Sequence, residues 1–210
     1  MGLIIGAVQF ITYAIFYLPI NFFFRVTTIR KLQLEELKRG LVLTANHQSR
    51  MDLILIFAAI PPKCYIRLLP MYGLVAEKYM NTWWKRLALT LLGCYPLRAG
   101  DKETAKALLF VLDKVDRGKT ILIFPEGRIL GEGEAVKANP GIGYLALRRS
   151  IKVLPIHLSG FRDVDLGKAI IRKYHARVAL GKPQAYFGKE INKPTIIADK
   201  ILRNIYKLGA

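Results

Sequence analysis

His47 and Asp52 are the side chains in this sequence whose types and spacing most directly suggest proton-transfer chemistry. They lie five positions apart in the stretch Asn46-His47-Gln48-Ser49-Arg50-Met51-Asp52, between the apolar runs 41–43 and 53–60. On one regular helix, five residues turn through about 500°, which would leave the two side chains about 140° apart. They can meet if His47 lies in a turn and Asp52 lies in the first turn of the next helix. A histidine held by a carboxylate in this way acts as a general base toward a hydroxyl group.

The same stretch also fits a purely structural role. Ser49 and Asp52 are spaced as in a capping box, and a carboxylate is stabilised at the positive end of a helix dipole. In that interpretation His47 is an ordinary turn residue. The spacing alone favours neither interpretation.

A second candidate stretch follows the apolar run 120–124, where Pro125 is succeeded by Glu126, Gly127 and Arg128. Ligands of open α/β sheets bind beyond the carboxyl ends of the strands, where these residues would lie. Gly127 allows a tight backbone turn, and the Arg128 guanidinium can hold a phosphate through two hydrogen bonds. The alternative is a simple strand-exit turn with solvated charges.

Two further stretches combine a short apolar run with a proline or an arginine. They are Gly93-Cys94-Tyr95-Pro96-Leu97-Arg98 and Leu154-Pro155-Ile156. Arg98 stands at a strand exit but equally fits a surface charge, and Pro155 equally fits an edge strand.

Helical and strand patterns alternate from residue 31 to the end of the sequence. Apolar runs predict strands over 41–44, 65–69, 94–97, 120–124, 152–157 and 176–180. Helical periodicity predicts helices over 53–60, 77–92, 102–116, 139–149 and 195–208. Such alternation favours an α/β fold, with a mainly parallel sheet flanked by helices.

Residues 3–24 form an uncharged, aromatic-rich segment that is long enough to span a bilayer as a helix. We expect Pro19 and Asn21 to kink or end this helix in its last third. The basic residues that follow, Arg25 and Arg30, indicate a cytoplasmic flank. A helix lying in one leaflet fits as well as a spanning one, and a helix buried in the domain is the alternative. We therefore predict a hydrophobic helical membrane anchor over 1–38 and one domain over 39–210.

The charge and the hydropathy of the chain restrict the class of partner. The 33 basic and 15 acidic residues give a net charge of +18, while 52% of the residues are hydrophobic and the mean hydropathy is +0.25. A basic surplus of this size indicates an anionic partner, either nucleic acid or an anionic membrane. The apolar excess favours the membrane, and no pattern of stacking aromatic and basic residues supports nucleic-acid binding.

Together and in this order, the four stretches resemble the motifs of the glycerolipid acyltransferase family, typified by bacterial 1-acyl-glycerol-3-phosphate acyltransferase. The stretch 46–52 matches the family's His-x4-Asp signature, and Phe124-Pro125-Glu126-Gly127 matches its third motif. The stretches 93–98 and 154–156 look like its second and fourth motifs. The resemblance runs from Leu41 to Gly160, and the apolar segment before it fits the family's membrane anchor.

Two departures from the family pattern concern the arginines. The family commonly reads Phe-Pro-Glu-Gly-Thr-Arg, whereas Arg128 follows Gly127 directly here. The resulting sequence is similar to the acyltransferase half of the bifunctional acyl-carrier-protein synthetase and lysophosphatidylethanolamine acyltransferase. In the second motif, Arg98 falls five residues after Gly93, where many members have the arginine at six.

The resemblance implies an O-acyltransferase of phospholipid biosynthesis. A fatty acyl group would move from acyl-CoA or acyl-acyl-carrier-protein to the free hydroxyl of 1-acyl-sn-glycerol-3-phosphate (lysophosphatidic acid). His47 would be the general base, oriented by Asp52, with the substrate hydroxyl in place of a serine nucleophile. The acceptor and its phosphate would be bound by a further set of residues, namely Ser49, Arg98, Glu126, Gly127, Arg128 and Lys137. Among these, Glu126 would accept a hydrogen bond from the acceptor hydroxyl or hold an arginine.

It further implies membrane lipids, a lysophospholipid and an acyl thioester donor as partners, with acyl carrier protein as one donor and no nucleic acid. No cofactor is expected beyond the donor, and no metal, because His47, His157 and His175 are dispersed along the chain. The active site would lie on the cytoplasmic side of the inner (plasma) membrane. The alternatives are another lysophospholipid acceptor, such as lysophosphatidylethanolamine, and a non-catalytic basic protein of the membrane surface.

Overall fold

The computed structural model describes all residues except 31, 99, 132, 133, 135, 148–150, 163, 165, 187–192 and 210. Within the described residues, one seven-stranded sheet has the strand order β1-β7-β6-β2-β5-β3-β4. Neighbouring strands are parallel except for β6 and β7, which are antiparallel. The strands are β1 (Thr27–Ile29), β2 (Leu41–Ala45), β3 (Met71–Ala76), β4 (Cys94–Leu97), β5 (Thr120–Ile123), β6 (Lys152–Ser159) and β7 (Arg177–Leu180). The predicted α/β fold around a mainly parallel sheet is confirmed.

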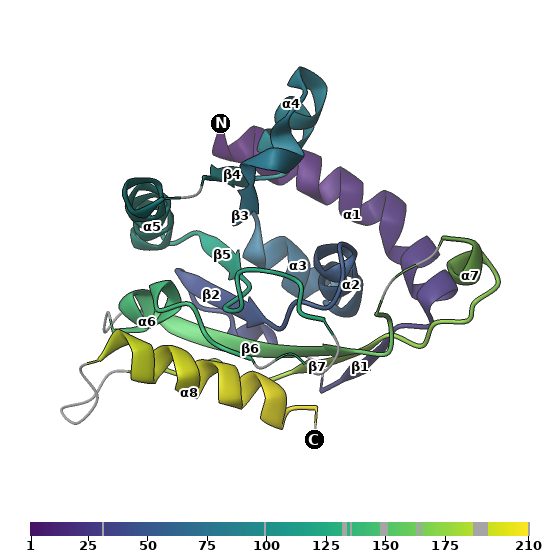
Figure 1. Ribbon diagram of the computed structural model, residues 1–210. Helices are drawn as coiled ribbons and strands as arrows, with labels where there is room; N and C mark the ends of the chain where they lie inside the picture. Colours follow the sequence, from purple (N-terminus) through teal and green to yellow (C-terminus); the bar gives the residue numbers. More distant parts are fainter. Residues whose placement is uncertain are drawn as a thin grey trace.

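Helices cover both faces of the sheet (Figure 1). One face carries α1 (Gly2–Phe24), α2 (Asp52–Ala59) and α3 (Pro62–Leu68), whose buried side chains share one apolar cluster with the sheet. The other face carries α5 (Asp101–Asp116), α6 (Gly141–Ala146) and α8 (Pro194–Lys207), which enclose a second cluster. The remaining helices are α4 (Trp83–Leu91), α7 (Leu166–Ile170) and the short 3-10 turns η1 (Leu34–Glu36) and η2 (Glu77–Met80).

Strand β2 is the central strand that precedes the His47 stretch. All five of its residues are buried, and it pairs with β5 on one side and β6 on the other. A continuous apolar run is what a parallel strand covered on both faces requires, because neither set of alternating side chains meets water. The chain therefore leaves the sheet at its centre just before His47.

The strand predicted over 65–69 is wrong. Residues 65–68 belong to α3, Leu69 follows its end, and the strand of this region begins at Met71. Pro62 at the first helical position favours a helix start, and Tyr65 and Leu68 are buried at helical spacing. A short apolar run does not by itself distinguish a strand from a buried helix.

Other element boundaries also differ from the predictions. The helix predicted over 77–92 is divided into η2 and α4, and the helix predicted over 139–149 spans only Gly141–Ala146, with 148 and 149 outside the described residues. The short elements β1 and α7 were not predicted. The division into segments 1–38 and 39–210 stays a prediction, although β1, in the first segment, pairs with β7.

Helix α1 continues through Pro19 and ends at Phe24, where Arg25 adopts a left-handed conformation with φ 47°. It is long and apolar enough to cross a membrane, with a mean hydropathy of 1.9, and only 17% of its most apolar stretch is buried. Polar contacts hold the inner side of α1 against the rest of the domain. The Gln9 side chain bonds the amide and the carbonyl of Met71 and the carbonyl of Leu92, and the Tyr13 hydroxyl donates to the Ile60 carbonyl at 2.8 Å.

Candidate active site

The carboxyl ends of four adjacent parallel strands bring four polar side chains to one level of the sheet edge. One paired row crosses these strands and consists of Leu43, Leu122, Gly73 and Cys94. Four residues further along the sequence from this row stand His47 after β2, Glu126 after β5, Glu77 after β3 and Arg98 after β4. The strand register therefore explains why residues far apart in the sequence share one edge.

The order of the strands sets the spacing along this edge. β2 and β5 are neighbours, so His47 and Glu126 leave adjacent strands, whereas Arg98 leaves β4, three strands from β2. With about 4.8 Å between neighbouring strands, β2 and β4 are separated by about 14 Å within the sheet.

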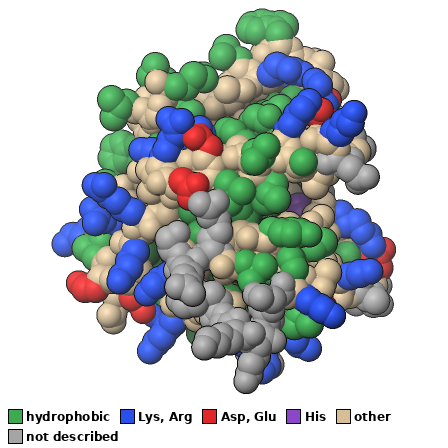
Figure 2. All heavy atoms as spheres, turned by 90° about the vertical axis from the view of Figure 1, so that its left-hand side faces the viewer, with side chains coloured by type: hydrophobic (Ala, Val, Ile, Leu, Met, Phe, Trp, Pro, Cys, Tyr) green, Lys and Arg blue, Asp and Glu red, His purple; other side chains and the backbone are tan. Residues whose placement is uncertain are grey.

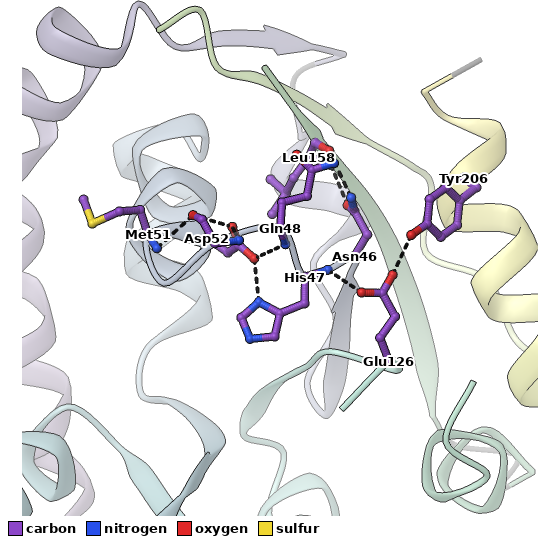
Figure 3. A network of polar contacts seen from close by, with 9 residues as sticks. Asn46, His47, Gln48, Met51, Asp52, Glu126, Leu158 and Tyr206 are labelled. Atoms are coloured by element: carbon purple, nitrogen blue, oxygen red, sulfur yellow. Dashed lines mark hydrogen bonds and ion pairs between the residues drawn. The ribbon is translucent and has the colours of Figure 1, made fainter. Parts of the chain in front are cut away.

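His47 and Asp52 are in direct contact (Figure 3). The His47 Nδ1 atom lies 2.6 Å from the Asp52 Oδ2 atom. The contact is possible because His47 lies in the loop after β2, while Asp52 is the first residue of α2. A carboxylate only accepts hydrogen bonds, so Nδ1 carries a proton, and in the neutral imidazole the lone pair is on Nε2.

The Asp52 carboxylate also closes its own loop. Besides the His47 ring, it accepts hydrogen bonds from the backbone amides of Gln48 (2.7 Å) and Ser49 (2.9 Å) and from the Ser49 hydroxyl (3.0 Å). Asp52 is only 1% exposed. Asp52 thus orients the His47 ring from the first turn of α2, but the expected capping box is not formed, because the N-cap of α2 is Met51 and no side chain caps it. Ser49 is buried, and its hydroxyl also accepts from the Met51 amide.

Neighbouring strands hold the His47 loop from both sides. From β5, the Phe124 ring stacks on the His47 ring at 4.2 Å, and the Glu126 Oε2 atom accepts the His47 backbone N–H at 2.8 Å. From β6, the backbone N–H and C=O of Leu158 bond the Asn46 side chain at 2.7 and 3.0 Å. The imidazole is therefore fixed in position and in orientation.

Glu126 bridges the loop to helix α8 (Figure 3). Its Oε1 atom accepts the Tyr206 hydroxyl at 2.7 Å, while Oε2 bonds the His47 amide. Burial raises the pKa of the Glu126 carboxyl, and the hydrogen bonds from Tyr206 and His47 oppose this effect. The role toward the acceptor that the resemblance implies for Glu126 stays a prediction, and in the structure its partners are the His47 amide and the Tyr206 hydroxyl.

The other predicted binding residues lie along the same edge and its loops. The Arg98 side chain bonds both carboxylate oxygens of Glu77 at 2.7 Å, and Arg98 thereby holds the pKa of the Glu77 carboxyl below its usual value. Gly127 has φ +70° and would have open space around a side chain, so only its backbone conformation requires glycine. Arg128 forms an exposed ion pair with Glu134 at 2.7 Å, and Lys137 is exposed on the same loop.

Tyr206 is a site residue that the sequence did not predict. It lies 80 positions from Glu126, on an amphipathic helix whose pattern indicates only packing against the sheet. A single tyrosine on such a helix has no spacing motif that would connect it with the Phe124-Pro125-Glu126-Gly127 stretch.

Two structural features bear on cofactors and ligands. Among the residues that the structure describes, no group of three or more His, Cys, Asp and Glu side chains is placed to hold a metal. A hollow of about 420 Å³ lies at the opposite, amino edge of the sheet, lined by residues that precede β2 and β5, among them Arg39 and Lys119. It is remote from His47, so we do not assign it to the chemistry of the site.

A histidine–aspartate pair thus lies at the carboxyl edge of an α/β sheet and is held by contacts from both neighbouring strands. The fold is similar to the crystal structure of the 1-acyl-sn-glycerophosphate (LPA) acyltransferase PlsC from Thermotoga maritima, with a TM-score of 0.65. The two sequences are 17% identical, and the match covers 96% of this chain and 80% of that one. The family model described as Acyltransferase matches residues 24–159, and the chain belongs to this family. The expected family and the expected enzyme class, an acyltransferase, are confirmed.

Proposed function

We propose that the chain transfers a fatty acyl group from acyl-CoA or acyl-acyl-carrier-protein to the free hydroxyl of 1-acyl-sn-glycerol-3-phosphate in phospholipid biosynthesis. The observation that carries the proposal is the 2.6 Å contact between His47 Nδ1 and Asp52, which leaves Nε2 free to act as a base. His47 and Asp52 are the catalytic residues of the proposal. No further cofactor and no metal takes part in it.

The reaction begins when the His47 Nε2 atom accepts the proton of the acceptor hydroxyl. The hydroxyl oxygen attacks the carbonyl carbon of the thioester, a C–O bond forms, and the carbonyl electrons move to its oxygen. When the carbonyl re-forms, the C–S bond breaks and the leaving thiolate takes the proton back from Nε2. Asp52 stabilises the imidazolium that exists between these two proton transfers.

An alcohol is a poor nucleophile at neutral pH, so the base is required, but it does not supply the whole rate enhancement. General-base catalysis contributes about 10²–10⁴-fold. Positioning of the hydroxyl against the thioester has to supply much of the remainder. The fixed His47 ring, stacked on Phe124 and held by Glu126 through its backbone, is suited to that demand.

Arg98 is the first candidate for binding the acceptor phosphate. Its guanidinium has five N–H donors, and its two hydrogen bonds to Glu77 leave three of them for a phosphate. Glu77 also restrains the arginine at the edge where His47 lies. Gly127, Arg128 and Lys137 complete the proposed phosphate-binding surface, and Ser49 supports it indirectly through Asp52.

Helix α1 would attach the enzyme to the membrane that contains its substrate. Its outer side is apolar, and the positive charges of Arg25 and Arg30 follow it directly. Basic residues that flank an apolar helix favour the cytoplasmic side. We therefore place the active site on the cytoplasmic side of the inner (plasma) membrane, where acyl thioesters are available.

The decisive experiment replaces His47 by alanine in the full chain. We expect H47A to lose acyl transfer to lysophosphatidic acid by at least about 10²-fold, while vesicle binding and thermal unfolding stay close to those of the unmodified chain. Turnover by H47A at the normal rate would refute the proposed mechanism.

A second acceptor is favoured by one sequence feature. Arg128 follows Gly127 directly, as in the lysophosphatidylethanolamine acyltransferase half that the sequence resembles. Initial rates with lysophosphatidic acid and with lysophosphatidylethanolamine, each with both thioester donors, separate the two acceptors. A phosphate monoester carries more negative charge than a phosphoethanolamine, so an Arg98-dependent preference for lysophosphatidic acid is expected.

A further inference from the structure

Helix α4 is a nine-residue helix in which no residue is buried. Its large apolar side chains are exposed to 77% at Trp83, 55% at Trp84 and 54% at Leu87. Figure 1 shows α4 standing out from the sheet at its β4 end, beside α1. A helix this short depends on tertiary packing of one face for its stability. The exposed apolar face of α4 therefore calls for a partner.

The composition of this face identifies the chemistry of the partner. Trp83 and Leu87 lie one turn apart and share a face of the helix. Cations accompany them, since the Lys85 Nζ atom lies 5.3 Å from the Trp84 ring and Lys78 lies in the preceding turn, η2. Figure 2 shows hydrophobic side chains gathered at the top of the molecule, where α4 lies, with lysine and arginine beside them. Tryptophan next to basic residues is typical of a helix at the surface of an anionic membrane.

The two ends of α4 connect α1 with the active-site edge. At the carboxyl end, the Leu92 carbonyl accepts a hydrogen bond from Gln9 of α1 at 2.9 Å. At the amino end, α4 follows η2, which begins with Glu77 just after β3, at the same carboxyl edge of the sheet as His47. In η2, the Tyr79 ring lies 5.9 Å from the Arg50 guanidinium. Arg50 belongs to the loop between His47 and Asp52. Helix α4 thus lies between α1 and the edge where the acceptor would bind.

We propose that α4 is a second membrane contact, distinct from α1, and that its partner is an anionic phospholipid bilayer. Trp83, Trp84 and Leu87 lie at the boundary between headgroups and acyl chains, while Lys78 and Lys85 face the headgroups. The net charge of +18 supports an anionic surface over a neutral one. The inference rests on the proposed function in one respect, since this contact holds the His47 edge at the membrane from which a lysolipid comes.

The test uses the fluorescence of the full chain bound to vesicles of phosphatidylcholine and phosphatidylglycerol. Trp83 and Trp84 are the two tryptophans of the sequence, so the signal reports on α4 alone. We expect brominated phosphatidylcholine in the vesicles to quench the emission and aqueous iodide to quench it weakly. Strong iodide quenching without any effect of brominated lipid would overturn the proposal, even if α1 keeps the protein on the vesicles.

A matched pair of variants keeps both tryptophans as reporters. Leu87→Asp on α4 and Leu109→Asp on α5 each replace an exposed leucine by a carboxylate. We expect L87D to reduce quenching by brominated lipid severalfold and L109D to leave it unchanged. Equal effects of the two variants, or a concentration-dependent shift of the emission without vesicles, which would indicate a second copy of the chain, would both contradict a lipid-binding α4.

Turnover measurements separate this inference from the proposed function. We expect L87D to lower acyl transfer to lysolipid in vesicles and to keep the normal rate with a short-chain lysolipid dispersed as monomers. Loss of both rates in L87D would contradict a role limited to the membrane contact. If the unmodified chain has no activity with either substrate, the proposed function fails, and the quenching result still decides the location of α4.

Discussion

Asp52 combines two tasks that point mutations can separate, because it binds the His47 ring through one oxygen and Ser49 through the other. We expect Asp52→Asn to lower kcat by about 10²–10⁴-fold, since an amide provides neither the charge nor the second acceptor that orients the imidazole. Ser49→Ala is the matched control, because it removes the two hydrogen bonds of the hydroxyl, to Asp52 and from the Met51 amide, and leaves the His47 contact intact. Steady-state rates and thermal unfolding of both variants check this; equal losses of kcat would indicate a structural role alone.

Tyr206 is connected with His47 through one intervening residue, Glu126. The Tyr206 hydroxyl donates to the Glu126 carboxylate, which also accepts the His47 backbone N–H. We expect Tyr206→Phe to lower kcat with little change in KM for the acceptor, since in the proposed mechanism the hydroxyl acts through Glu126 on the position of the base. The free energy of unfolding should fall by about 1.5–3 kcal/mol, as for a lost hydrogen bond to a charged group.

Tyr186→Phe is the control for this variant. The Tyr186 hydroxyl also bonds helix α8, through Asn204 at 2.9 Å, but has no connection with Glu126. It should lower the free energy of unfolding by about 0.5–1.5 kcal/mol and leave kcat unchanged. A similar fall of kcat in both variants would mean that α8 packing, rather than the Glu126 contact, matters for the rate.

At the residue scale, the sequence predicted the His47 and Asp52 pair because both lie within one strand-to-helix junction. It could not predict Tyr206, because a contact between a loop and a helix 80 positions later depends on how α8 packs against the sheet. It also assigned Glu126 to the substrate or to an arginine, since nothing in the motif shows that its nearest donors are a backbone amide and a phenol.

At the scale of elements, strand order and register determine which predicted residues become neighbours. The alternation of patterns predicted most strands, including β2 and β5, but sequence order does not reveal that β4 lies three strands from β2. The strand predicted over 65–69 was wrong because the apolar run continues a helix that begins after Pro61. Periodicity is ambiguous in runs this short.

Arg98 provides a test of this edge. We expect Arg98→Ala to raise KM for lysophosphatidic acid by about tenfold or more and to change kcat less, because the proposed phosphate contact would be made in both the ground state and the transition state. Arg117→Ala is the control, since Arg117 also pairs with a carboxylate, at 2.7 Å from Asp113, but precedes β5 at the opposite edge. Acceptor titrations at fixed donor measure both; equal effects would exclude a specific phosphate contact.

At the scale of the whole molecule, His157 links the sheet to α8 and makes stability depend on pH. Its ring packs against the Tyr206 ring, and burial lowers the pKa of His157 below its ordinary value. Above pH about 6.5 the residue is neutral in both the folded and the unfolded chain. Below that pH the unfolded chain binds the proton more readily, so stability is lost as the pH falls toward the folded pKa.

We therefore expect the free energy of unfolding of the unmodified chain to fall more steeply between pH 7 and pH 5 than that of His157→Phe, which keeps a ring against Tyr206. Denaturant unfolding at several pH values measures both slopes. The raised pKa of Glu126 acts in the opposite direction in both proteins and cancels in the comparison. Identical slopes would show that His157 is not responsible for the acid sensitivity.

The docking of α1 by Gln9 and Tyr13 has a practical consequence for anyone who wishes to remove the helix and obtain a soluble enzyme. The truncated chain would lose the side chain that satisfies the amide and carbonyl of Met71 and the carbonyl of Leu92, at the start of β3 and β4. It would also uncover Tyr65, whose ring stacks on Tyr13 at 3.9 Å. Deletion of α1 would thus expose buried apolar side chains and unpaired backbone groups to water, and we expect the shortened protein to aggregate.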